Sequence, residues 1–159
     1  MGAWVSFFAA AAGASATLAG LLVVAISINL SRILDYPHLP DRAASALVPL
    51  AGVLVVSMLA LVPQPASLFA IEVLVAGIAM WAQAGFLLIK SFGRTPGLRR
   101  AWVLTHVPLN QAQTLPFVAA GVLLTLGFPS GLYWIVPGVI ISLLAGIMNA
   151  WVLLIEILR

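Results

Sequence analysis

The sequence predicts an all-α fold, a polytopic bundle of five transmembrane helices that forms a single domain over residues 1–159. Hydrophobic residues make up 64% of the chain and charged residues 7%, with a mean hydropathy of +1.20, whereas a soluble domain carries about 25% charged residues. Five apolar runs approach or exceed the roughly 20 residues that a helix needs to cross a bilayer. The basic residues lie only after the first and third runs or at the C-terminus, which is the charge bias of cytoplasmic loops.

This charge bias also predicts the topology. If every run crosses the membrane, all the Lys and Arg residues lie on one side and the other side carries none. The N-terminus is then outside and the C-terminus is in the cytoplasm. The seven residues are Arg32, Arg42, Lys90, Arg94, Arg99, Arg100 and Arg159.

The first three spans follow from the apolar runs and the prolines between them. The first span covers about residues 4–30, and the prolines of the loop at 31–42 are expected to prevent the helix from continuing. The second span covers about 44–62 and ends at Pro63-Gln64-Pro65. The third covers about 67–89, so spans two and three form an antiparallel hairpin.

The fourth span, about 103–127, is harder to delimit because its uninterrupted apolar part covers only Leu115 to Gly127. That part would be about 20 Å long, which is short of the roughly 30 Å hydrocarbon core. Either one helix continues through Pro108 with kinks, or Asn110 caps a new helix and the segment before it lies along the membrane surface. The fifth span covers about 132–158.

Small residues at helical spacing predict the faces through which the first and fifth spans pack. In a bilayer, helices associate where small residues let the backbones approach closely. On the first span this face is expected to be the principal packing surface, with a seam between copies or the lining of a pore as the alternatives. The stripes are Ser6, Ala10, Gly13, Thr17, Gly20, Val24 and Ser27 on the first span, and Gly138, Ser142, Gly146 and Asn149 on the fifth.

Polar residues inside the spans are the candidate functional site. Glu72 is the one acid inside the first four predicted spans, whereas Glu156 lies at the predicted cytoplasmic end of the fifth. An intramembrane acid is by default a functional hypothesis. Alternatively, it lies shallow and is hydrogen-bonded to a residue such as Gln64 or Ser130. A polar track for a proton, a cation or a polar ligand would combine Glu72, Gln83, His106, Asn110, Gln113 and Asn149. The competing interpretation is that these Asn and Gln side chains join helices.

The sequence lacks the residues that metal binding and nucleophilic catalysis require. The chain has no Cys and only scattered His, Asp and Glu, so we predict no metal site, no cofactor and no catalytic residue. The pI near 10.2 comes from loop residues that orient the protein and contact lipid headgroups, chiefly Lys90, Arg94, Arg99 and Arg100. Nucleic acid is therefore not an expected partner.

Two segments, 13–30 and 149–159, resemble stretches in an uncharacterised family of small multi-helix inner-membrane proteins from high-GC bacteria. The resemblance implies a multi-pass protein of the bacterial inner membrane and no assigned activity. We expect a non-enzymatic, self-associating bundle, resembling a channel or transporter, that handles a small solute, an ion or a bound lipid at an internal polar site. The alternative is an accessory subunit or assembly factor of a larger membrane complex.

Overall fold

The computed structural model describes residues 2–35, 39–92 and 99–158. Within these ranges, the side chains at 32, 42, 88, 90–92, 99–106, 153–154 and 156–158 lie outside the description. All assigned elements in the described chain are helices, which confirms the all-α class. They are η1 (Gly2–Trp4), α1 (Val5–Ile28), α2 (Leu30–Asp35), α3 (Leu39–Leu61), α4 (Ala66–Phe92), α5 (Arg99–Thr125) and α6 (Gly131–Leu158).

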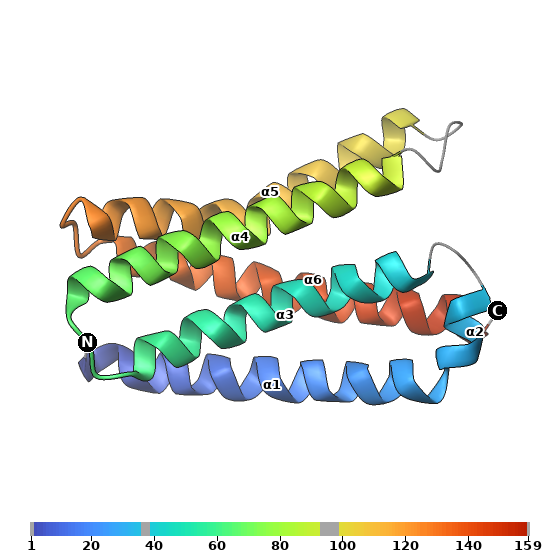
Figure 1. Ribbon diagram of the computed structural model, residues 1–159, viewed down its shortest axis with the longest axis horizontal. Coiled ribbons are helices and arrows are strands. Elements are labelled where there is room, and N and C mark those ends of the chain that lie inside the picture. Colours follow the sequence, from blue (N-terminus) through green and yellow to red (C-terminus); the bar gives the residue numbers. More distant parts are fainter. Residues whose placement is uncertain (1, 36–38, 93–98, 159) are drawn as a thin grey trace.

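The five long helices lie side by side and alternate in direction (Figure 1). The helix α3 is central, since it packs against α1, α4 and α6, while α5 packs between α4 and α6. One end of the bundle, here called the turn end, holds the N-terminus and the turns at 62–65 and 126–130; the opposite end, where α6 finishes, is the C-terminal end. The helices α5 and α6 lie close at the turn end and diverge toward the C-terminal end (Figure 1).

Four helical segments of the described chain are long and apolar enough to cross a membrane: Gly2–Ile28, Leu39–Leu61, Ala66–Leu87 and Gly131–Val152. They correspond to the predicted first, second, third and fifth spans. The helix α5 is as long as its neighbours but carries Asn110, Gln111 and Gln113 near its middle, and it does not join this set. Within the described ranges, the protein is therefore all-helical, with four helices of membrane-spanning length and composition.

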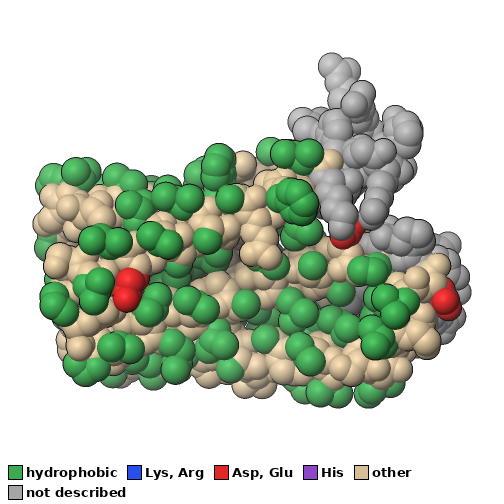
Figure 2. Space-filling model, in the orientation of Figure 1, with side chains coloured by type: hydrophobic (Ala, Val, Ile, Leu, Met, Phe, Trp, Pro, Cys, Tyr) green, Lys and Arg blue, Asp and Glu red, His purple; other side chains and the backbone are tan. Residues whose placement is uncertain are grey.

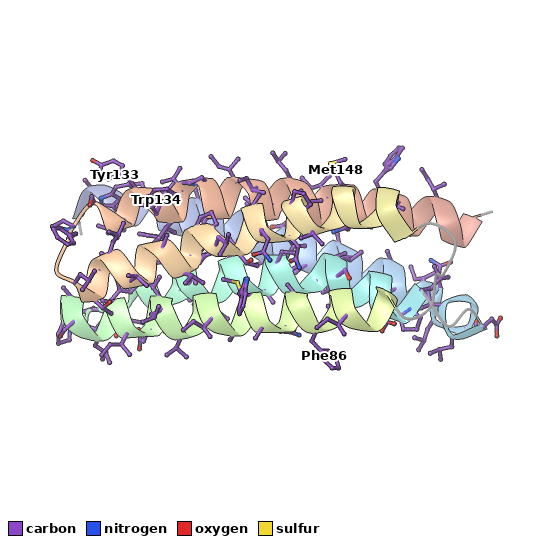
Figure 3. The ribbon with its side chains drawn as sticks, turned by 90° about the horizontal axis from the view of Figure 1, so that it is seen from above. Phe86, Tyr133, Trp134 and Met148 are labelled. Atoms are coloured by element: carbon purple, nitrogen blue, oxygen red, sulfur yellow. The ribbon has the colours of Figure 1, made fainter. Side chains whose placement is uncertain are left out.

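The surface of the described chain carries many exposed apolar side chains. In Figure 2, hydrophobic side chains are spread over the whole described part of the face, and acidic side chains on it are few and far apart. In Figure 3, the side chains of Phe86, Tyr133, Trp134 and Met148 point away from the bundle, and at least 49% of each residue is exposed. Soluble monomers seldom expose apolar area on this scale.

Two expectations for the helix boundaries change. The connection at 31–42 is more helical than predicted, because α2 covers Leu30–Asp35 and α3 begins at Leu39. Pro40 lies in the first turn of α3, where a helix does not use the missing N–H. For α5, the structure favours the continuous alternative, since one helix runs from Arg99 through Pro108 and Pro116 to Thr125.

The predicted packing face of α1 is wrong for contacts within one chain. All seven residues of the small-residue stripe are exposed, and nothing lies within 4 Å of a Cβ built at Gly13 or Gly20. The buried residues of α1 are instead Phe8, Ala11, Ala12, Ser15 and Leu22. Alanine and larger apolar residues occur on every face of α1. The spacing of the small residues therefore did not distinguish the face that α3 covers.

On α6, the stripe of small residues lies at helix–helix contacts. A Cβ at Gly138 would come within 2.9 Å of the Phe117 ring on α5, and one at Gly146 within 2.7 Å of Leu50 on α3. Ser142, between them, is buried. Sequence reasoning missed the closest approach, where Gly77 of α4 and Gly121 of α5 lie against each other's helix backbones.

Two apolar clusters form the core of the described chain. The larger cluster fills the turn-end half and includes residues from α1, α3, α4, α5 and α6, among them Phe8, Val56, Phe69, Phe117 and Ile135. The smaller one occupies the C-terminal half, and its buried members come from α1, α2 and α3. Leu143 and Ala150 of α6 pack against this smaller cluster.

Candidate functional site

A polar cluster lies where the turn-end core stops, between α5 and α6. It consists of Asn110, Gln113 and Thr114 of α5 and Ser142 of α6. The spacing of three and four residues places the α5 members on one helix face. Asn110, Thr114 and Ser142 are 8%, 5% and 1% exposed, so the cluster is an interior feature of the bundle.

Hydrogen bonds join the members of this cluster. The Gln113 Nε2 donates to the Asn110 Oδ1 at 3.3 Å, and the Thr114 hydroxyl donates to the Asn110 carbonyl at 2.9 Å. The Ser142 hydroxyl donates to the Gln113 carbonyl at 3.3 Å, which links α6 to α5. Asn110 and Gln113, predicted as site residues, are thus brought together, and Ser142, predicted as a packing residue, joins them.

One acceptor in the cluster lacks a donor. The Gln113 Oε1 is buried and receives no hydrogen bond from the described residues. A buried amide oxygen without a donor costs about 1–3 kcal/mol, and in a bilayer no surrounding water offsets that cost. A molecule that donates a hydrogen bond here would remove the penalty.

A second amide of α5 bonds to α4. The Trp81 Nε1 donates to the Gln111 Oε1 at 2.8 Å, on the exposed side of the helix pair. Sequence reasoning missed this contact, although Gln111 lies in the polar stretch that the sequence singled out. The bond links α4 to α5 outside the interior polar cluster.

Glu72 lies apart from the cluster, near the turn end. It is half-buried, and its Oε2 accepts a hydrogen bond of 2.6 Å from the Gln64 Nε2, which also donates to the Leu59 carbonyl at 3.0 Å. Gln64 is one of the two partners that the sequence suggested for a shallow Glu72. The side chain therefore ties α4 to the end of α3.

We expect Gln64→Leu to lower the free energy of unfolding by about 1–3 kcal/mol, because it leaves the Glu72 carboxyl and the Leu59 carbonyl without this donor. Unfolding in mixed micelles, followed by circular dichroism, measures the change. Gln83→Leu is the matched control, since Gln83 is exposed. Equal stability of the two variants would show that the Gln64 bonds contribute nothing.

The predicted polar track is not continuous. Gln83 points outward, because the interior face of α4 is formed by residues such as Phe69, Val73 and Met80. Asn149 is half-buried and lies seven residues beyond Ser142, about 10 Å along α6. His106, Lys90, Arg94, Arg99 and Arg100 were also predicted as site or headgroup residues, and their side chains lie outside the described ones.

Neither acidic residues nor histidines assemble into a metal site within the described chain. No group of three His, Cys, Asp or Glu side chains gathers there. Asp35 and Asp41 lie at the C-terminal end, far along the bundle from Glu72. The chemistry of the polar cluster is therefore that of amides and hydroxyls.

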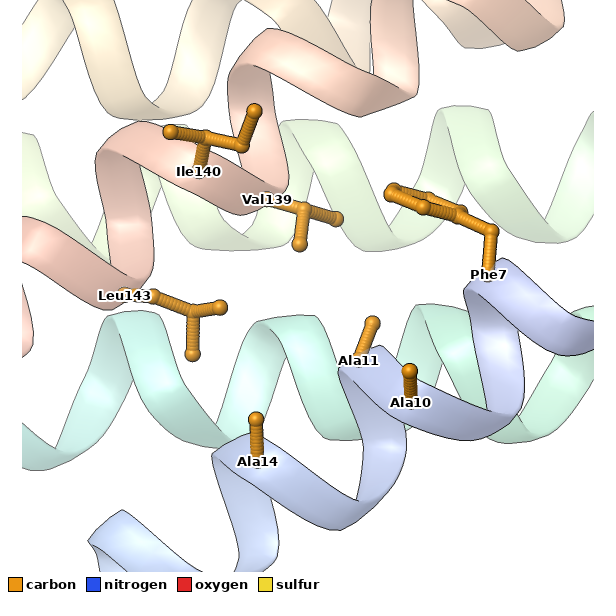
Figure 4. Close-up of a pocket in the computed structure, with 7 residues that line it drawn as sticks. All are labelled: Phe7, Ala10, Ala11, Ala14, Val139, Ile140 and Leu143. Carbon is orange, nitrogen blue, oxygen red and sulfur yellow. The ribbon is translucent and has the colours of Figure 1, made fainter.

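A shallow apolar pocket lies between α1 and α6 in the turn-end half. Its volume is about 220 Å³, and it is lined by Phe7, Ala10, Ala11, Ala14, Val139, Ile140 and Leu143 (Figure 4). The described lining has no charged or hydroxyl side chain, so the pocket suits hydrocarbon rather than a polar ligand.

Comparisons of the chain with protein-family models, with curated proteins and with solved structures give no match. The class of the protein accordingly rests on its own features. It is an all-helical chain with helices of membrane-spanning length, an apolar surface and an interior polar cluster.

Proposed function

We propose that the chain is a non-enzymatic, multi-pass protein of the bacterial inner membrane that handles a small solute at the polar cluster of α5 and α6. In this proposal all five long helices cross the bilayer, with the turn end outside and the C-terminal end in the cytoplasm. Support comes from the apolar surface and from the basic residues, which the sequence confines to connections at the C-terminal end and to the C-terminus. Such a distribution is typical of cytoplasmic loops.

The proposal depends on one observation, the buried Gln113 Oε1 without a donor. If the cluster served only to join helices, every buried polar atom in it would be expected to have a partner. The bonds between Gln113, Asn110 and Ser142 hold the free acceptor in place between two helices. A fixed and unpaired polar atom in an apolar surrounding is suited to binding a ligand.

We expect Gln113→Leu to reduce the retention of a small molecule by the protein. Loss of one hydrogen bond to a buried ligand weakens binding by about tenfold or more. Native mass spectrometry of mildly solubilised protein reports the retained mass, and circular dichroism checks the fold. Gln83→Leu is the control, because it removes the same side chain from an exposed position on α4. Identical bound masses in Gln113→Leu and wild type would contradict the proposal.

The exposed face of α1 favours self-association as part of this function. Its stripe of small residues is the predicted helix-packing surface, yet no other helix of the chain covers it. A second copy, packed α1 against α1, would use that face as the sequence leads us to expect. The second candidate function, an accessory subunit of a larger complex, would place a helix of another protein there.

A further inference from the structure

We infer that the α5–α6 cluster takes a neutral solute that donates hydrogen bonds, and that the solute enters from the C-terminal end of the bundle. The inference rests on the proposed function and adds the chemical class of the ligand and its route. Three features of the described chain carry it: the charge around the cluster, the kind of polar atom left unpaired, and the apolar core on one side of it.

The charge around the cluster favours a neutral ligand over a cation. Within the described side chains, the one acid inside the predicted spans is Glu72, and it bonds to Gln64 at the turn end. Gln113 lies near the middle of α5, so a cation beside it would have no described carboxylate to balance its charge. An ion without a counter-charge in a low-dielectric interior costs far more than a neutral group that keeps its hydrogen bonds.

The unpaired atom of the cluster indicates that the ligand donates a hydrogen bond. The Asn110 Oδ1, the Asn110 carbonyl and the Gln113 carbonyl each accept a hydrogen bond from within the cluster. The buried side-chain atom of the cluster that has no partner among the described residues, the Gln113 Oε1, is an acceptor. An amide N–H or a hydroxyl of the ligand would satisfy it, whereas a ligand with acceptors alone would not.

The apolar core closes the route from the turn end. Phe117 lies one helical turn beyond Gln113 in that direction, is fully buried and packs against Gly138 of α6. Val73, Ile135 and Val139 belong to the same cluster, so a polar solute would have to cross close-packed hydrocarbon. Toward the C-terminal end, the backbones of α5 and α6 diverge (Figure 1).

Because the sequence has no cysteine, a single introduced thiol tests both the class and the route. We would place it at Ser142 in the cluster, with Ile135 of the apolar core as the matched control on the same helix. The reagent is iodoacetamide, a small neutral amide. It is added to inside-out vesicles and, separately, to right-side-out vesicles. Glutathione inside the vesicles consumes any reagent that crosses the membrane. Thr114→Cys provides a second reporter if Ser142→Cys does not fold.

We expect Ser142→Cys to be alkylated from the cytoplasmic face at least about tenfold faster than Ile135→Cys, since a close-packed site reacts only after local opening. Acetamide should slow this alkylation, and ammonium chloride at the same concentration should not. Protection by ammonium instead of acetamide, or reaction only from the outer face, would overturn the inference but leave a ligand site in place. If neither Ser142→Cys nor Thr114→Cys reacts faster than Ile135→Cys from either face, the proposed function is overturned too.

Discussion

Gly121→Ala is expected to lower the free energy of unfolding by about 3 kcal/mol or more, the upper part of the range for overpacked interiors. A Cβ at Gly121 would lie within 2.6 Å of the Leu74 backbone nitrogen and closer still to its Cα. Backbone atoms cannot rotate away as a side chain does, so α4 and α5 would have to separate. Separation would also strain the contact at Gly77, which packs against the Phe117 backbone one turn away.

Unfolding in mixed micelles, followed by circular dichroism, measures this loss. Gly20→Ala is the control, because a Cβ there meets nothing within 4 Å. At an exposed helical position the same change is favourable by up to about 1 kcal/mol, so the two variants are expected to shift stability in opposite directions. A Gly121→Ala protein as stable as wild type would show that α4 and α5 do not approach as closely as described.

The double substitution Gly13→Ile and Gly20→Ile is expected to convert a self-associated protein to monomers in the bilayer. Both glycines lie on the exposed stripe of α1, where branched side chains would hold a neighbouring helix away. Energy transfer between labelled copies in liposomes, measured over a range of protein-to-lipid ratios, reports the change. Gly85→Ile is the control, since Gly85 also has open space around it but lies on α4.

The same experiment separates the two candidate assemblies. Energy transfer that persists unchanged in the double variant would exclude α1 as the seam between copies. A wild-type protein that is monomeric by itself but purifies with a stoichiometric second protein through α1 would support the accessory role. In either case the fold of one chain should stay intact, because these positions contribute no contact within it.

The linear order of hydrophobic and polar residues determined the helical class and most of the helix positions. In lipid, a long apolar segment can satisfy its backbone N–H and C=O groups only by forming a helix. Turn residues such as Pro63 and Gly127 mark where the apolar runs are interrupted. Gly127 has a φ of +83°, a conformation that glycine adopts without strain. Asn110 and Gln113 could also be identified as candidate site residues from the sequence, because polar amide side chains are unusual within an apolar helix.

Orientation about each helix axis was decided only by the tertiary structure. In a soluble protein, the polar face of a helix points to water and so indicates which face is buried. Both faces of α1 are apolar, so its sequence pattern did not indicate the buried face. As a result, the structure differs from the sequence prediction in three places. The stripe of small residues on α1 is exposed, Gln83 faces the surface, and Glu72 bonds to Gln64 and lies apart from Gln113. Close approaches such as Gly121 against Leu74 depend on how two helices cross, and that geometry arises from the packing of side chains distant in the sequence.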